Sequence, residues 1–357
     1  MSAPGPVRFA VAGADHLHLF QLVDRLILSG AQPIAHTDEG GLVDAYESWQ
    51  QGSRRSTLDE ILADDSIDLL VTAGIPRLRA DTALAALAAG RSVLSDKPGV
   101  TTVEQLGQIR NAIDGRPGRP WTVLFSERFE NRAVSRAVSL ARTGGIGAVV
   151  QVSSTGPHSL ASDRRPDWFW DPDATGGILV DIGSHQFDQF LAIVGESDLG
   201  PDLGSVEVGW AAVGNVACPD HPTMQDTGAV VLTAPGVVGD LRVDYLSPTG
   251  LPVWGDVRLT IVGTTGTLEA RANIDVTGRP GAEHLIHVDA EGVRRLDVGD
   301  DPITWADTLL LDLADDGERL MPQAHVLAVC DLALRAQRAA LPWGSGPAHP
   351  GERHRST

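Results

Sequence analysis

Residues 7–26 read VRFAVAGADHLHLFQLVDRL, and this stretch decides the expected fold. An apolar, strand-like run ends at Gly13 and is followed by apolar residues at helical spacing. The same alternation continues along the first third of the chain, where apolar runs at residues 67–74 and 92–98 are separated by helical patterns. Near-continuous apolar strands between amphipathic helices predict a parallel sheet covered on both faces, a doubly wound α/β fold.

The pattern changes from Val149 onward, where strand-like runs with alternating polarity lie close together. This predicts a mostly antiparallel sheet with one covered face. We therefore expect a doubly wound Rossmann-like domain over residues 1–127, an α+β domain with an open-faced sheet over 128–343, and a disordered tail over 344–357.

Composition limits the possible partners. The chain has 357 residues, 42% of them hydrophobic, and a formal net charge of −19, which disfavours nucleic acids and anionic membrane surfaces. Cys218 and Cys330 are the two cysteines, so we expect buried thiols in a reducing compartment and no metal site. With no long apolar segment, the protein is expected to be soluble and cytoplasmic and to act on a small molecule.

The turn after the first strand departs from the G-x-G-x-x-G pattern of dinucleotide-binding folds, because Asp15 and His18 replace its second and third glycines. A carboxylate about 4 Å from a phosphate costs about 4 kcal/mol at an effective dielectric of about 20. Asp15 could instead cap the following helix and leave the pyrophosphate to backbone amides or to His16 and His18. A dinucleotide site and a Rossmann-like turn without a ligand are both compatible with this stretch.

Acidic residues follow the second strand. Asp38 and Glu39 lie about 25 residues after Gly13, where a carboxylate accepts hydrogen bonds from the adenosine ribose. This favours NAD over NADP, although these residues could also be ordinary loop acids. NADP stays open because Arg54 or Arg55 could reach a 2′-phosphate.

Two further segments carry candidate catalytic groups. Lys97 follows a strand at the edge where parallel sheets bind ligands, and could stabilise alkoxide charge. Asp181, His185 and Asp188 fall at positions i, i+4 and i+7, on one face of a predicted helix. An imidazole exchanges protons near neutral pH, and a nearby lysine would lower its pKa. Taken singly, the lysine and the Asp–His pair could each be ordinary surface groups.

Taken together, these residues resemble the Gfo/Idh/MocA oxidoreductase family, which includes glucose-fructose oxidoreductase and inositol dehydrogenase. Residues 83–105 resemble the family's A-L-x-A-G-K-H-V-x-x-E-K-P block, and residues 176–188 resemble its G-G-x-L-x-D-x-G-x-H-x-x-D helix. Residues 257–270 look like its G-T-x-G-x-L-E hairpin, so the likeness runs from about residue 7 to about residue 340.

The resemblance implies a catalytic set of Lys97, Asp181 and His185. His185 would accept a proton from a secondary hydroxyl, Lys97 would hold that oxygen, and Asp181 would orient a neighbouring hydroxyl. It also implies two groups of binding residues, with no metal. The cofactor group is Gly13, Asp15, His16, Leu17, His18, Asp38, Gly74, Ile75, Asp96, Lys97 and Glu127, and the substrate group is Arg128, Trp168, Asp181 and His185.

Some positions depart from the family. Asp96 replaces the usual glutamate, and Arg77 and Arg79 stand where many members have an asparagine and a histidine. Arg79 could bind an acidic substrate group or lie exposed at the start of a helix. Trp168 and Trp170 could stack on a sugar ring or serve only for packing.

The resemblance implies an NAD(P)-dependent oxidoreductase that transfers a hydride between a nicotinamide and a secondary hydroxyl or carbonyl of a sugar, inositol or related polyol. Two alternatives remain: a non-catalytic, ligand-sensing member with a weakened cofactor site, and an NAD-dependent glycoside hydrolase or lyase. The apolar open sheet of the second domain predicts a homodimer or homotetramer.

Overall fold

The computed structural model describes residues 5–114, 120–195 and 205–343. The tail predicted to be disordered, residues 344–357, lies outside these ranges.

The N-terminal part contains the predicted parallel sheet. Its strands have the order β3-β2-β1-β4-β5-β6 and every neighbouring pair is parallel, which is the strand order of a Rossmann fold. The doubly wound α/β prediction is therefore confirmed. The strands are β1 (Arg8–Ala14), β2 (Gln32–His36), β3 (Arg54–Arg55), β4 (Leu69–Ala73), β5 (Ser92–Asp96) and β6 (Trp121–Leu124).

Helices cover this sheet because each has one apolar face. In the first of them, Leu19, Leu22, Val23 and Leu26 recur at helical spacing and are buried against the sheet. Thr57 begins the third with a capping box, its hydroxyl accepting from the amide of the helix's third residue. The helices are α1 (His18–Leu28), α2 (Val43–Trp49), α3 (Leu58–Ala63), α4 (Pro76–Ala88) and α5 (Val103–Ile113).

The second sheet is mixed but mostly antiparallel, as predicted. Its order is β14-β13-β12-β11-β7-β10-β9-β8-β15, and the parallel pairs are β7 with β10 and β8 with β15. The strands are β7 (Val149–Pro157), β8 (Glu207–Gly214), β9 (Thr227–Ala234), β10 (Val237–Asp244), β11 (Val257–Gly263), β12 (Gly266–Ala272), β13 (Glu283–Asp289), β14 (Gly292–Leu296) and β15 (Leu341–Pro342).

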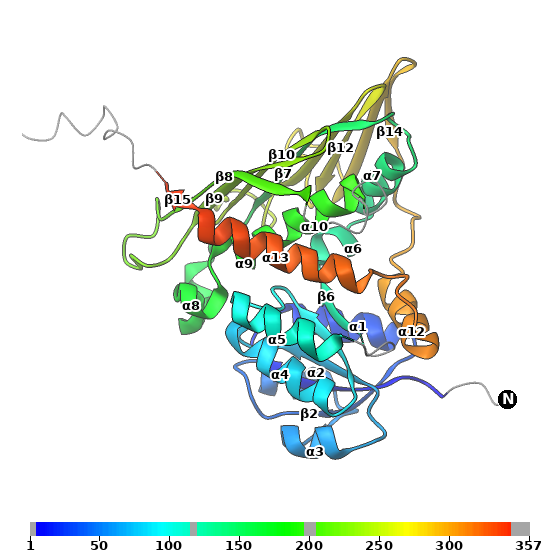
Figure 1. Cartoon of the computed structure of the whole chain (residues 1–357), viewed down its shortest axis with the longest axis vertical. Helices are drawn as coiled ribbons and strands as arrows, with labels where there is room; N and C mark the ends of the chain where they lie inside the picture. Colours follow the sequence, from blue (N-terminus) through cyan, green and yellow to red (C-terminus); the bar gives the residue numbers. More distant parts are fainter. Residues whose placement is uncertain (1–4, 115–119, 196–204, 344–357) are drawn as a thin grey trace, which may run out of the picture.

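Helices lie on one face of the second sheet, between it and the Rossmann domain (Figure 1). The long α13 crosses this junction and contacts α5 and β6 on one side and β8 and α10 on the other. These helices are α6 (Ser126–Phe129), α7 (Arg132–Arg142), α8 (Pro172–Thr175), α9 (Ile178–Asp181), α10 (Gly183–Val194) and α13 (Gln323–Ala339).

One late helix packs on the first domain. Helix α12 (Trp305–Asp315) lies against α1, and its Trp305 and Leu309 are buried in the same core as Leu19. The Trp305 indole N–H also donates to Glu130 at 2.5 Å. The chain therefore returns to the Rossmann domain after β14, before its last strand, β15, joins the second sheet.

Two expectations from composition can be compared with the structure. Cys218 and Cys330 are free and buried, as predicted. Within the described ranges, we find no helix with the length and apolarity needed to span a bilayer.

Candidate active site

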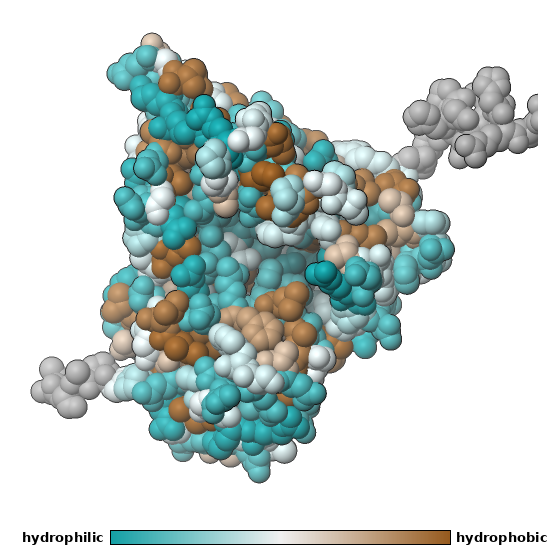
Figure 2. Space-filling view, turned by 180° about the vertical axis from the view of Figure 1, so that it is seen from behind, coloured by the Kyte–Doolittle hydropathy of each residue, from teal (hydrophilic) through white to brown (hydrophobic). Residues whose placement is uncertain are grey.

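A cleft of about 970 Å³ lies between the two domains, a size typical of small-molecule sites. Figure 2 shows the hollow between the lower and upper parts of the molecule, lined largely by hydrophilic residues. Its lower wall comes from the segments after β1 and β5, at the carboxyl edge of the parallel sheet. Its upper wall comes from the segments after β7 and β10 and from helices α9 and α10.

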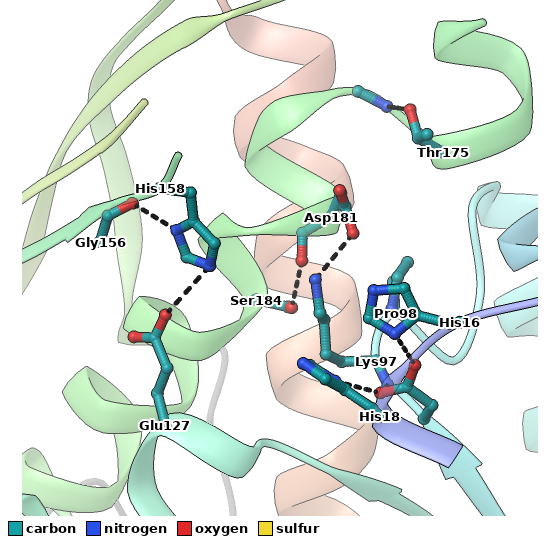
Figure 3. Close-up of polar contacts among 12 residues, drawn as sticks. His16, His18, Lys97, Pro98, Glu127, Gly156, His158, Thr175, Asp181 and Ser184 are labelled. Carbon is teal, nitrogen blue, oxygen red and sulfur yellow. Dashed lines mark hydrogen bonds and ion pairs between the residues drawn. The ribbon is translucent and has the colours of Figure 1, made fainter. Parts of the chain in front are cut away.

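Lys97 and Asp181 meet in this cleft from opposite domains. The Lys97 Nζ atom is 2.9 Å from Asp181 Oδ1 (Figure 3). The Tyr245 hydroxyl donates to Asp181 Oδ2 at 2.9 Å. Burial alone would raise the pKa of Asp181, but the Lys97 charge and the two hydrogen bonds outweigh it and lower that pKa to about 2. The carboxylate is therefore ionised and fixed in orientation.

His185 lines the same cleft from the first turn of α10. It is 1% exposed, and its Nδ1 atom is buried without a hydrogen-bond partner among the described residues. Burial, followed by the nearby Lys97 charge, lowers the pKa of His185 well below its usual value. The imidazole is neutral at neutral pH and can accept a proton.

A second cluster lies at the opening turn. His16 Nδ1 is 2.7 Å from Asp96 Oδ2, and His18 Nδ1 is 2.9 Å from Asp96 Oδ1. Burial would raise the pKa of Asp96, but the His18, Arg79 and His16 contacts lower it well below its usual value. Burial lowers the pKa of His16 to about 4.

The same cluster has the composition of a metal site, which the sequence analysis did not anticipate. The ligand atoms of His16, His18 and Asp96 lie within 4.8 Å of one another. However, both Asp96 oxygens are already engaged, because the amide of Lys97 and the guanidinium of Arg79 also contact them. Direct hydrogen bonds therefore account for the grouping without an ion.

The proposed capping role of Asp15 is wrong. The residue before α1 is Leu17, which has no side-chain cap, and Asp15 Oδ1 instead accepts from the amide of Gly41 at 2.9 Å. The carboxylate is held by the segment after β2. The amides of Leu17 and His18 have no hydrogen-bond partner among the described residues.

Arg79 is buried, so the interpretation that it lies exposed at the start of a helix is wrong; it lines the cleft, but its guanidinium is bound to the protein itself. It is 1% exposed, and its guanidinium donates to the carbonyl oxygens of Gly74 and residues 96–98. It also pairs with the Asp96 carboxylate at 3.2 Å. Arg79 therefore holds the segment that carries Lys97, while Arg77 is exposed.

Asp188 and Arg128 do not lie in the cleft. Asp188 is 0% exposed and accepts two 2.6 Å hydrogen bonds from Arg128 and one of 2.8 Å from His325. The expectation that one helix carries Asp181, His185 and Asp188 is wrong, because α9 ends at Asp181 and α10 begins at Gly183. Arg128, predicted to bind substrate, is instead committed to this buried ion pair.

Trp168 and Trp170 differ in whether they line the cleft. Trp168 lines the cleft, as expected for a substrate-binding residue. Trp170 stacks on His221 with ring centroids 3.7 Å apart, so its face is covered by the protein itself.

The remaining predicted cofactor positions fall in two places. Leu17 and Glu127 line the cleft, whereas Asp38 is exposed at the end of β2. Gly74 and Ile75 lie between β4 and α4, beside Gly13 but not among the residues that line the cleft. The arginines near the ribose position are engaged, since Arg54 binds Asp64 and Arg55 binds Glu47.

Several residues of the upper wall of the cleft were not predicted from the sequence. Tyr245 and His158 directly follow β10 and β7, and Trp254 lies nearby, with its ring 4.5 Å from that of His158. Because β7 and β10 are parallel neighbours, their carboxyl ends meet at one edge of the sheet. The available signal was a polar aromatic residue directly after each of two strands.

The backbone of the opening turn fits a dinucleotide. Gly13 has φ of +82°, and a Cβ there would lie 2.9 Å from the Gly74 Cα atom, so the turns after β1 and β4 pack backbone to backbone. The partnerless amides of Leu17 and His18 lie at the positive end of α1, where phosphate groups bind in such folds.

Comparisons with family models match both domains. Residues 12–119 match the oxidoreductase family with an NAD-binding Rossmann fold, and residues 134–269 match the GFO/IDH/MocA C-terminal domain.

Individual relatives agree with this assignment. A provisionally assigned oxidoreductase from Erwinia carotovora atroseptica has a crystal structure with a TM-score of 0.88 and 33% identity, covering 94% of this chain and 99% of that one. Inositol 2-dehydrogenase 2 of Saccharopolyspora erythraea is 26% identical over 77% of this chain and 75% of its own length. A levoglucosan dehydrogenase in complex with NADH, at 17% identity and a TM-score of 0.75 over 94% of this chain and 98% of its own, shares the fold.

Two curated relatives are matched over less of their length. These uncharacterized oxidoreductases of Schizosaccharomyces pombe are 26% and 30% identical, each over 39% of this chain, and the matches span 38% and 37% of their own length.

Proposed function

Because the chain belongs to the Gfo/Idh/MocA oxidoreductase family, with an NAD-binding Rossmann domain, we propose that it interconverts a secondary alcohol and a carbonyl on a sugar, inositol or related polyol with NAD(P). The observation that carries the proposal is the arrangement of Lys97, Asp181 and His185 in one cleft at the carboxyl edge of the parallel sheet.

Each side chain has a distinct task in this proposal. The nicotinamide, when bound, supplies the hydride acceptor or donor. His185 accepts the hydroxyl proton, because its ring is neutral and its Nδ1 atom has no partner among the described residues. Lys97 carries a positive charge that stabilises the developing alkoxide. Asp181 holds the Lys97 ammonium in place and is itself held by Tyr245.

The cofactor site would use the opening turn and the adjacent cluster. The amides of Leu17 and His18 would hold the pyrophosphate, and His16 and His18 lie in the same wall of the cleft. We favour NAD over NADP, because Asp38 follows β2 and both nearby arginines already bind carboxylates.

The first test is a turnover screen. Purified protein is assayed with NAD⁺ and NADP⁺ against myo-inositol, D-xylose, D-glucose, levoglucosan and D-glucuronate, following absorbance of the reduced nicotinamide. We expect turnover with at least one polyol, and Lys97→Met should reduce kcat/KM about 100-fold or more because the charge on the alkoxide is lost.

Cofactor binding separates the alternatives. NADH titrated into wild-type protein in a calorimeter should bind, and K97M should bind NADH within about threefold of wild type. Absence of NADH and NADPH binding would favour the ligand-sensing alternative and contradict the proposal. Binding together with release of the aglycone from aryl glycosides would instead favour the glycoside hydrolase or lyase alternative.

A further inference from the structure

Glu127 and His158 face each other across the inner part of the cleft without touching. Their nearest polar atoms, Glu127 Oε1 and His158 Nε2, are 3.8 Å apart, which is too far for a direct hydrogen bond (Figure 3). Both residues line the cleft. Burial raises the pKa of Glu127 and lowers that of His158, and the Lys97 charge opposes the first shift and adds to the second, so the pair lies near the proposed catalytic lysine.

Glu127 presents a hydrogen-bond donor to this gap. Its Oε2 atom accepts from the amide of Gln186 at 2.7 Å and that of Gln189 at 3.5 Å, while its Oε1 atom is buried without a partner among the described residues. Burial raises the pKa of Glu127 to about 8, so the carboxyl is protonated at neutral pH. Since Oε2 faces two amide donors, the proton belongs on Oε1.

His158 presents an acceptor to the same gap. Its Nδ1 atom is 3.1 Å from the carbonyl oxygen of Gly156, which can only accept, so Nδ1 carries the proton. Burial lowers the pKa of His158 to about 3, and the neutral ring therefore has an unprotonated Nε2. The Trp254 ring, 4.5 Å away, holds the imidazole in position.

A hydrogen-bond donor and an acceptor that lie 3.8 Å apart can both bind one hydroxyl group placed between them. An oxygen atom can lie about 2.8 Å from both, accepting from Glu127 and donating to His158, and a hydroxyl does both at once. A carboxylate cannot donate to His158, and an ammonium cannot accept from Glu127.

We propose that Glu127 and His158 form a hydroxyl-binding subsite that holds a second hydroxyl of a polyol substrate in the same cleft as Lys97 and His185. The role of this subsite in substrate binding rests on the proposed function. Its ability to bind a hydroxyl does not. The 3.8 Å gap between a protonated carboxyl and an unprotonated imidazole nitrogen is expected to hold a hydroxyl or a water molecule even without a substrate.

One test needs no substrate. Infrared difference spectra of the whole protein, titrated from about pH 5 to about pH 10, should show a protonated carboxyl band that disappears near pH 8 in wild type and is absent in Glu127→Gln. A crystal structure at neutral pH should also show an oxygen atom within about 3.2 Å of both Glu127 Oε1 and His158 Nε2. A band that is unchanged in E127Q, or a gap without an oxygen atom, would overturn the proposal.

A second test measures selection. Calorimetric titration of myo-inositol into the NADH-loaded protein should show about 10- to 100-fold weaker binding for Glu127→Leu, which removes the donor to the hydroxyl oxygen. Glu127→Gln keeps a donor, so it should bind within about threefold of wild type and should not weaken at alkaline pH. Wild type should weaken above about pH 8, where ionised Glu127 no longer donates.

Glu104→Gln is the control, because Glu104 is an exposed residue in the first turn of α5. It should bind like wild type. If E127L binds myo-inositol as tightly as wild type does, the proposed role of Glu127 in binding a polyol hydroxyl is wrong. If wild type binds no polyol, the proposed function fails, and the subsite is then decided by the infrared and crystallographic results.

Discussion

Lys97 is the only lysine in the chain, which otherwise carries its positive charge on arginine. Its single ammonium is buried in the cleft and paired with Asp181. A compact ammonium on a flexible stem can contact one substrate oxygen and one carboxylate together, whereas a planar guanidinium favours two parallel contacts with a carboxylate. This difference supports a specific role for a lysine at position 97.

Arg79 offers a test of how the segment around Lys97 is held. Replacing Arg79 with alanine removes the buried cation beside the Asp96 carboxylate and the guanidinium that donates to the carbonyl oxygens of residues 96–98. We expect a loss of about 3–5 kcal/mol in the free energy of unfolding, measured by urea denaturation.

Arg77→Ala is the matched control, because Arg77 lies on the same helix but is exposed. Its effect on the free energy of unfolding should stay within about 0.5 kcal/mol. Equal effects of the two substitutions would contradict the role assigned to Arg79.

The roles of single residues depend on neighbours that are distant along the chain, and the sequence shows such neighbours only in part. Lys97, Asp181 and His185 could be predicted to lie in one cleft, because a strand end and a helix carried recognisable motifs. The positions of Arg79 and Asp188 could not, because their partners lie on other elements of the chain: Asp96 for Arg79, and Arg128 and His325 for Asp188. Spacing along a helix does not contain that information.

At the level of elements, the turn between β1 and α1 depends on one glycine. Gly13→Ala would require a left-handed backbone and place a Cβ 2.9 Å from the Gly74 backbone, since the φ of Gly13 is +82°. We expect a loss of more than about 2 kcal/mol in the free energy of unfolding, together with weaker NADH binding, because the turns after β1 and β4 must separate.

Gly90→Ala isolates the cost of the backbone angle. Gly90 has φ of +75°, but a Cβ there meets nothing within 4 Å. The Gly90→Ala variant should lose about 1 kcal/mol in the free energy of unfolding and should bind NADH as wild type does. If urea denaturation and calorimetry gave the same values for both variants, the close approach to Gly74 would not matter.

The pairing of strands explains what was missed in the upper wall. A sheet predicted as mostly antiparallel sends neighbouring strand ends to opposite edges. The parallel pair β7 and β10 instead brings His158 and Tyr245 together, with ring centroids 6.2 Å apart. Parallel pairing inside an otherwise antiparallel sheet requires a long crossover, and nothing in the local sequence of either strand distinguishes it.

For the whole molecule, hydrophobic periodicity was sufficient to predict the two sheets and their order along the chain. It did not predict that α12 returns to the Rossmann domain, because its apolar face could equally cover the second sheet. Trp305 decides this, since its indole is buried in the Rossmann core and donates to Glu130. That return brings a third segment of the chain to the junction beneath the cleft.

We propose that the outer face of the second sheet joins copies of the chain into a homodimer or homotetramer. Gly239 faces Phe190 of α10, so its neighbour Val238 points away from the helices and is 46% exposed, and Trp210 and Val288 are also exposed on this sheet. Apolar side chains on an open sheet face are typical of an interface between subunits. Val238→Glu would place a charge in that interface.

Light scattering coupled to size-exclusion chromatography should therefore give a smaller assembly for V238E than for wild type. Val103→Glu is the matched control, because Val103 is a valine of nearly equal exposure, 47%, at the start of α5 in the Rossmann domain. It should leave the assembly unchanged, since the proposed interface excludes that domain. A monomeric wild type, or dissociation by V103E instead of V238E, would contradict the sheet as the interface. Because the cleft lies on the helix-covered side, V238E monomers should retain NADH binding, so assembly and cofactor binding can be separated.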